Sequence, residues 1–128
     1  MTRRAVQLAF LVALAGAALL QVAGPSTAAR PPSPSEAAAI RKAIAHSPGK
    51  WMCCAEMVRV THIRVSSADR SFASAQIQGL SKQSQVAEVL LWRGTKRWAV
   101  IDEGSDFLGC NLVVTAVRKD LFNTALCP

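Results

Sequence analysis

Four short segments between residues 56 and 103 place the strongest constraint on the fold of this chain. Each is rich in β-branched residues or alternates apolar with polar side chains, and either pattern is typical of a strand. The segments are Glu56–Ser66, Phe72–Gln78, Val86–Arg93 and Arg97–Glu103. The turns between them are short, and the clearest one is Gly94-Thr95-Lys96. Strands joined so closely pair antiparallel, so the sequence predicts a four-stranded antiparallel sheet.

The first of these segments changes the phase of its apolar residues partway along. Val58 and Val60 occupy even positions, whereas Ile63 and Val65 occupy odd ones. Because side chains alternate between the two faces of a strand, this change indicates either a β-bulge or a strand that is buried on both faces. The sequence leaves both alternatives open.

A helix is predicted before the strands. Ser33 suits its N-cap, because Pro34 follows at the first helical position and Glu36 can reach back to the cap amide. Residues 37–46 continue it with strong helix formers and end at a Ser-Pro-Gly turn. A helix this short depends on packing against the rest of the domain for its stability.

A second helix is predicted after the strands, over Thr115–Phe122, with Thr115 as its N-cap. Val117 and Leu121 are spaced one helical turn apart and would pack inward. We therefore expect an α+β fold with an N-terminal helix, a four-stranded antiparallel sheet and a C-terminal helix. Both helices would cover one face of the sheet.

Residues 1–29 have the three parts of a secretory signal peptide. Two arginines supply the positive start, and Leu8–Leu20 is an uncharged apolar run. The segment ends in the small residues Thr27-Ala28-Ala29, so we expect cleavage after Ala29. A retained membrane anchor is the alternative, but a spanning helix needs about 20 consecutive apolar residues, more than this run supplies.

Cleavage at that point predicts an exported domain, either secreted or held in the periplasm or cell envelope. Residues 30–34 would form a flexible Pro/Ser-rich lead-in, and residues 35–128 a single domain with no membrane span. Removing Arg3 and Arg4 with the leader lowers the formal net charge from +7 to +5. A basic exported domain suits anionic wall polymers, lipid headgroups or an acidic protein, and export argues against nucleic acid. Only Arg93, Lys96 and Arg97 cluster among its basic residues.

Four cysteines, Cys53, Cys54, Cys110 and Cys127, all follow the leader. In an oxidising compartment an even number of cysteines favours disulfide bonds. We predict that Cys110 pairs with Cys127, which would tie the C-terminus to the end of the fourth strand. Cys53 and Cys54 would then pair with each other or stay reduced; the alternative is that each bonds to a different distant cysteine.

The C-terminal half has a pattern that resembles a known group of proteins. Trp98–Ser105 ends a hairpin, Gly109-Cys110 follows, and an amphipathic helix leads to the terminal Cys127. Upstream, Ile63–Ala73 has a strand-turn-strand pattern with an aspartate in the turn. Together these segments resemble a group of small exported bacterial proteins, chiefly from actinobacteria, which is largely uncharacterised. The resemblance implies an α+β sheet domain and supplies no catalytic residues.

The segment Met52-Cys53-Cys54-Ala55-Glu56-Met57 has the most unusual local composition. Thiolates and thioethers are soft ligands of the kind that binds Cu(I), so Met52, Cys53, Cys54 and Met57 form a candidate copper site. Both methionines also fit as ordinary core side chains, and disulfide formation would consume the thiolates. We favour the structural interpretation and keep copper binding as an alternative.

For the other polar residues a structural role is favoured over a catalytic or metal-binding one. His62 with Asp102 or Glu103 could be imagined in a hydrolase triad, but no G-x-S-x-G turn presents a serine. Asp102, Glu103 and Asp106 could bind Ca²⁺, although neighbouring acids at the end of a strand are more often turn and cap residues. Enzymatic activity is therefore the least favoured interpretation.

Trp92 and Trp98 flank the last turn and could face each other across the hairpin. Cross-strand packing is the favoured role of this pair, and a platform for sugar or peptide is the alternative.

The sequence thus favours a non-enzymatic, cofactor-free binding domain that acts at the cell envelope or outside the cell, on an envelope component or a protein ligand. One alternative is a secreted protease inhibitor, whose reactive loop would be the polar segment Gly79–Gln85. The other is copper binding through the Met-Cys-Cys-x-x-Met segment.

Overall fold

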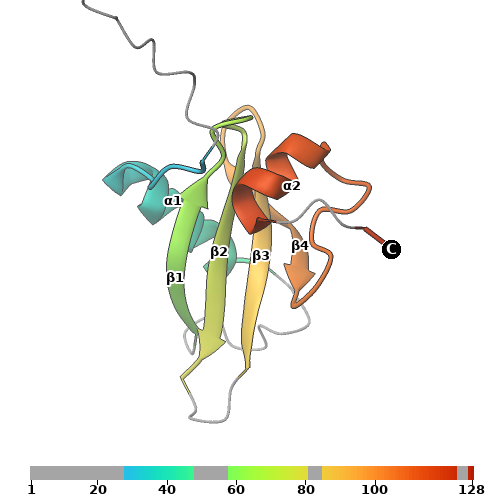
Figure 1. Ribbon diagram of the computed structural model, residues 1–128. Coiled ribbons are helices and arrows are strands. Elements are labelled where there is room, and N and C mark those ends of the chain that lie inside the picture. The colour runs from blue at the N-terminus through green and yellow to red at the C-terminus, as the bar shows by residue number, and fades with distance from the viewer. Residues whose placement is uncertain (1–27, 48–57, 81–84, 124–126) are drawn as a thin grey trace, which may run out of the picture.

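The chain folds into a sheet with one helix on each side of it (Figure 1). This computed structural model describes residues 28–47, 58–80, 85–123 and 127–128. The elements, in chain order, are α1 (Pro34–Ala45), β1 (Val58–Val65), β2 (Phe72–Gly79), β3 (Val86–Arg93), β4 (Trp98–Gly104) and α2 (Thr115–Phe122). The strands pair antiparallel in the order β1-β2-β3-β4, so the predicted α+β fold is confirmed.

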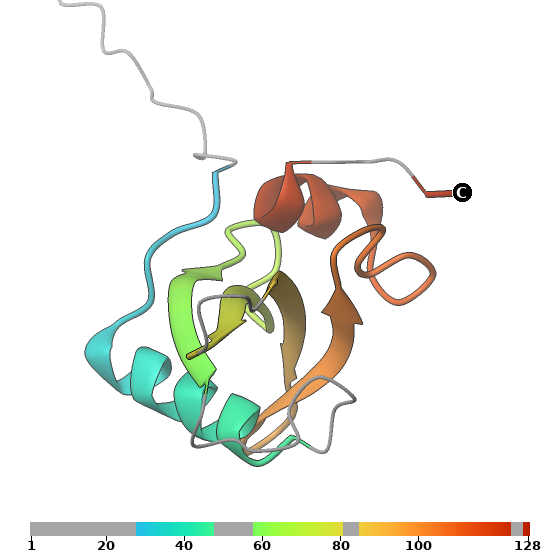
Figure 2. The same cartoon turned by 90° about the horizontal axis from the view of Figure 1, so that it is seen from below.

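The two helices cover opposite faces of the sheet, so the expectation that both lie on one face is wrong. Figure 2 shows the curved sheet between α1 and α2. Ile40 and Ile44 of α1 pack against one face together with Val89 and Leu91 of β3. Leu90 points to the other face, where it packs with residues of α2. The continuous apolar run in β3 therefore serves two cores, which a search for alternation does not anticipate.

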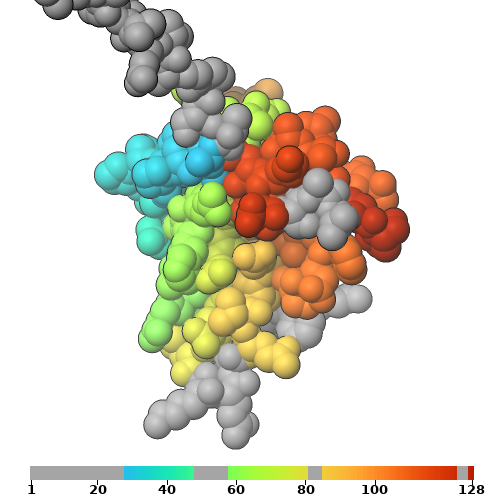
Figure 3. Space-filling view, in the orientation of Figure 1, coloured from blue at the N-terminus to red at the C-terminus, as the bar shows by residue number. Residues whose placement is uncertain are grey.

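The second core is the smaller one and lies at one end of the sheet. Val117 and Leu121 of α2 pack there around Leu90 and Leu108. In the space-filling view α2 covers the upper part of this face, and β2 and β3 stay visible below it (Figure 3).

The change of apolar phase in β1 is a β-bulge, the first of the two predicted alternatives. The pairing register between β1 and β2 shifts between Thr61 and Arg64, and His62 lies there at φ 50°. The extra residue keeps Val60 and Ile63 on the same core, the one that α1 covers.

The predicted capping box of α1 is also confirmed. The backbone N–H of Glu36 donates to Ser33 Oγ over 3.2 Å, and the backbone N–H of Ser33 donates to Glu36 Oε2 over 2.8 Å. Arg30 adds a two-pronged ion pair, with Nη1 2.9 Å from Glu36 Oε2 and Nη2 2.7 Å from Oε1. Arg30 also forms a backbone bridge with Val65 of β1, with both N···O distances at 2.9 Å. The start of α1 is thereby fixed to the edge of the sheet.

These bonds lower the pKa of Glu36 to about 2, mainly through the Arg30 guanidinium and next through the Ser33 amide. The carboxylate therefore stabilises the fold above the pKa of the unfolded chain, about 4.3, and this contribution is lost as the pH falls through about 2. We expect Glu36→Gln to lower the free energy of unfolding at neutral pH by about 1 kcal/mol, because the partly exposed Arg30 is screened by solvent.

Urea denaturation at neutral pH and near pH 2 measures this difference, which should be largely lost at the lower pH. Glu88→Gln is the matched control, since the Glu88 carboxylate lies 3.5 Å from the Gln76 amide and is in no ion pair of the described residues. Equal destabilisation by both variants, or a Glu36→Gln effect that does not change with pH, would refute the role of the ion pair.

Helix α2 begins at Thr115 as its first helical residue, and Val114 is the N-cap. The prediction that Thr115 is the N-cap is wrong. Its hydroxyl instead accepts a hydrogen bond from Arg118 Nη2 over 3.3 Å, a contact between two side chains one turn apart on α2. No side chain caps the amides of this helix at Val114, and its position depends on tertiary contacts.

Hydrogen bonds attach α2 to the sheet, and a disulfide ties the C-terminus to the segment after β4. Arg64 of β1 donates to the carbonyls of Asp120, over 3.3 Å, and Leu121, over 3.4 Å. Asp120 accepts hydrogen bonds from the turn between β1 and β2, at Ser66 Oγ and the Ser67 amide. Cys110 and Cys127 form the predicted disulfide, with their Cα atoms 5.8 Å apart. None of the helices in the described ranges is long and apolar enough to cross a membrane.

Candidate functional site

A groove with a volume of about 740 Å³ runs between α1 and the hairpin of β3 and β4. Its walls come from the flank of α1 beside the buried Ile40 and Ile44, and from the end of β3, the turn and the start of β4. The residues that line it are Ser35, Glu36, Ala39, Lys42, Ala43, His46, Ser47, Arg93, Lys96, Arg97, Trp98, Ala99 and Val100. The groove exists because α1 buries one face against the sheet and leaves a polar flank beside the sheet edge.

The groove is strongly basic. Lys42, Arg93, Lys96 and Arg97 line it, and within the described part of the chain none of them is in a salt bridge. Among the described residues of its walls Glu36 is the only acid, and the bonds from Arg30 already neutralise that carboxylate. Four cations thus face a shared hollow with no acidic partner of their own, an arrangement that attracts anions.

Trp98 is the largest apolar side chain that lines the groove. Its indole is only 6% exposed and belongs to the core beneath α1. Arg93 is the cross-strand partner of Trp98, and its guanidinium carbon lies 5.5 Å from the centre of the indole ring. This cation–π contact holds the Arg93 charge over the groove.

His46 lies at the end of α1 and has a structural role there. Its backbone amide closes the helix on the carbonyl of Lys42, and its ring Nδ1 lies 2.7 Å from the same oxygen. The ring is thereby fixed beside Lys42 at the mouth of the groove.

A second hollow, of about 600 Å³, lies around Trp92. Trp92 opposes Ala99, whereas Trp98 opposes Arg93. The two indoles therefore point to opposite faces of the hairpin, and the prediction that they could face each other is wrong. Arg93 and Trp98 form the last pair before the turn. Trp92 precedes Arg93 by one residue, so its side chain lies on the face opposite to that of Trp98. Trp92 remains 46% exposed.

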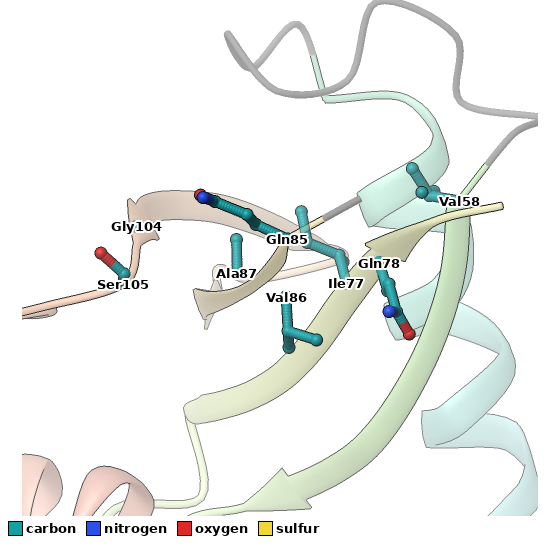
Figure 4. Close-up of a pocket in the computed structure, with 9 residues that line it drawn as sticks. Val58, Ile77, Gln78, Gln85, Val86, Ala87, Gly104 and Ser105 are labelled. Atoms are coloured by element: carbon teal, nitrogen blue, oxygen red, sulfur yellow. The ribbon is translucent and has the colours of Figure 1, made fainter. Parts of the chain in front are cut away.

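A smaller, mainly apolar pocket of about 320 Å³ lies at the other end of the sheet, where β1 and β3 begin and β2 and β4 end (Figure 4). Its described lining residues are Val58, Ile77, Gln78, Gly79, Gln85, Val86, Ala87, Gly104 and Ser105. This lining contains no charged side chain. The basic groove is therefore the better-defined site chemically.

The acidic residues at the end of β4 hold the following turn. Asp102 accepts hydrogen bonds from the amides of Gly109, over 2.7 Å, and Glu103, over 3.0 Å. His62 is exposed on β1, at the opposite edge of the sheet, so the imagined triad with Asp102 is not assembled. Asp106 is exposed and accepts from the Ser105 hydroxyl over 3.2 Å.

The predicted copper ligands Met52, Cys53, Cys54 and Met57 lie outside the described residues. Within the described ranges, no three His, Cys, Asp or Glu side chains come together as a metal site. The predicted inhibitor loop Gly79–Gln85 is described only at its ends, where Leu80 is 58% exposed. Both hypotheses stay predictions.

The sequence already showed that Arg93, Lys96 and Arg97 cluster. It did not show that Lys42 joins them, because Lys42 lies on α1 and meets the hairpin only in the folded chain. The sequence signal that pointed to the α1 side of the groove is the four-residue spacing of Lys42 and His46, which puts both side chains on one flank of the helix.

Comparisons with protein-family models, with curated proteins and with solved structures found no match for this chain.

Proposed function

We propose that this protein is a non-enzymatic, exported binding domain whose basic groove holds an anionic component of the cell envelope. The observation that supports this most strongly is the set of four cations, Lys42, Arg93, Lys96 and Arg97, which line one groove and have no acidic partner in the part of the chain that the structure describes. Such a set suits phosphate, sulfate or carboxylate groups that repeat along a polymer or a surface.

The chemistry of the groove favours binding over catalysis. Glu36, the one acid among its described lining residues, has its pKa lowered to about 2, mainly by Arg30, and is therefore unsuited to act as a general base near neutral pH. The disulfide between Cys110 and Cys127 agrees with function in an oxidising compartment outside the cytoplasm. The leader-like residues 1–29 support the same location.

Neutralising two cations of the groove tests the proposal. The double variant Lys96→Gln/Arg97→Gln should bind inorganic polyphosphate roughly 30-fold more weakly than the wild type, because each cation beside a dense anionic array contributes about 1 kcal/mol. Fluorescence anisotropy with labelled polyphosphate, at low and at physiological ionic strength, measures this loss. The difference should shrink at the higher ionic strength.

Arg59→Gln/Lys119→Gln is the matched control, since it removes the same net charge from exposed positions on β1 and α2. This control should retain wild-type affinity to within about twofold if the groove is the site. If both double variants lose affinity equally, binding depends only on net charge. In that case, or if the wild type does not bind polyphosphate even at low ionic strength, the proposed function is wrong.

A further inference from the structure

The basic groove does not end at the hairpin. Lys96, Arg97 and Ala99 line both the groove beneath α1 and the hollow around Trp92. The two hollows lie on opposite faces of the hairpin and meet at its turn, next to the free edge of β4. The cations of the turn are therefore placed between two binding spaces, and a long ligand could occupy both.

The second hollow offers a different chemistry from the first. Trp92 is 46% exposed there, so much of its indole ring is open to a ligand. Gly94 keeps part of this ring uncovered, since a Cβ at Gly94 would lie 3.3 Å from Trp92 Cζ3 and 3.4 Å from Cη2. The hollow thus combines a flat aromatic face with the charges of Lys96 and Arg97.

We infer that the ligand is an anionic polysaccharide that crosses the hairpin turn. One of its sugar rings packs on Trp92, and its acidic groups pair with Lys96 and Arg97 and continue toward Lys42 and Arg93. A sugar ring has a face of C–H groups that packs flat on an indole, whereas its carboxylate or sulfate groups need cations beside that ring. This inference rests on the proposed function and names the ligand class of the same groove.

Two other anionic ligands fit the geometry less well. A lipid bilayer approaches a protein from one side, but Trp92 and the groove beneath α1 lie on opposite faces of the hairpin. Single-stranded nucleic acid could also stack on Trp92. However, the Cys110–Cys127 disulfide indicates an oxidising compartment outside the cytoplasm, where nucleic acid is not the expected ligand.

Two probes separate ring packing from charge. Polygalacturonate has a carboxylate on every sugar ring, and inorganic polyphosphate has charge without rings. We expect Trp92→Ala to weaken polygalacturonate binding about tenfold, through loss of apolar contact area, and to change polyphosphate binding less than about twofold. Lys96→Gln/Arg97→Gln should weaken the binding of both probes. Labelled probes in fluorescence anisotropy measure the six affinities of the wild type and the two variants.

A second substitution guards against a merely structural effect of Trp92→Ala. Gly94→Val keeps Trp92 but sets a side chain against its ring, which covers part of it and displaces it slightly, so this variant should also weaken polygalacturonate binding selectively. Circular dichroism and thermal melting show whether each variant is folded.

Equal weakening of both probes by Trp92→Ala and Gly94→Val, or no weakening of either, would overturn the polysaccharide inference and leave the proposed function standing. Tighter binding of single-stranded DNA or of anionic lipid vesicles than of polygalacturonate would also overturn it. If the wild type binds neither polyphosphate nor polygalacturonate, both the proposed function and the polysaccharide inference are wrong.

Discussion

Asp120→Ala is expected to lower the free energy of unfolding by about 3 kcal/mol. Asp120 is buried on α2, and its Oδ2 accepts from Ser66 Oγ over 2.7 Å, from the Ser67 amide over 2.6 Å and from the Ala68 amide over 3.3 Å. Alanine would leave the fully buried Ser66 hydroxyl without its carboxylate acceptor and would release the turn between β1 and β2 from α2. Hydrogen bonds to a charged group contribute about 1.5–3 kcal/mol each.

The loss stays below the sum of these bonds because the carboxylate is itself costly to bury. Asp120 Oδ1 is buried and has no hydrogen-bond partner among the described residues, so removing the charge recovers part of its desolvation cost. Asp120→Asn, which keeps an acceptor oxygen but not the charge, should lose about half as much as alanine.

Urea denaturation of both variants measures these losses. The control is Asp106→Ala, an exposed position on the chain after β4, which should change stability by less than about 0.5 kcal/mol. If Asp120→Ala is no more destabilising than Asp106→Ala, Asp120 does not anchor α2 to the sheet.

Removing the disulfide with Cys110→Ser/Cys127→Ser is expected to cost about 3 kcal/mol as well. The bond links residues 17 apart in sequence and so restricts the unfolded chain, while it fixes the C-terminus to the segment between β4 and α2. Chemical denaturation with and without reductant measures the effect. Reductant should lower the stability of the wild type to that of the variant.

The same experiment reports on the other two cysteines. The double variant retains Cys53 and Cys54, so any further loss of its stability in reductant would come from a disulfide made by these residues. A double variant that is as stable as the oxidised wild type would contradict the stabilising role of the Cys110–Cys127 bond.

The strands and the first helix were predictable because their signals are local. β-branched composition or alternation indicated the strand positions, the phase change between Val60 and Ile63 offered the bulge as one of two alternatives, and Ser33 with Glu36 predicted the capping box. Each of these signals involves residues within a few positions of one another, which is the range over which backbone geometry alone sets the pattern.

The remaining features depend on contacts between distant segments. The sequence does not indicate that Leu90 faces a second core, because the residues of α2 that cover Leu90 are distant from it in sequence. The start of α2 at Thr115 depends on packing more than on capping chemistry. The groove needs Lys42 and the hairpin together, and only the packing of α1 along β4 achieves this. The relative orientation of the Trp92 and Trp98 side chains depends on the pairing register of β3 and β4, which the sequence alone does not specify to one residue.

Mapping the binding surface tests the central claim most directly. In a ¹H–¹⁵N correlation spectrum of the wild type, polyphosphate added at low ionic strength should shift the amides of Lys42, Arg93, Lys96 and Arg97 most strongly. The amides of α2 and of β1 should change little. Perturbations centred on α2 or β1, or none at all, would contradict the assignment of the groove between α1 and the hairpin as the binding site.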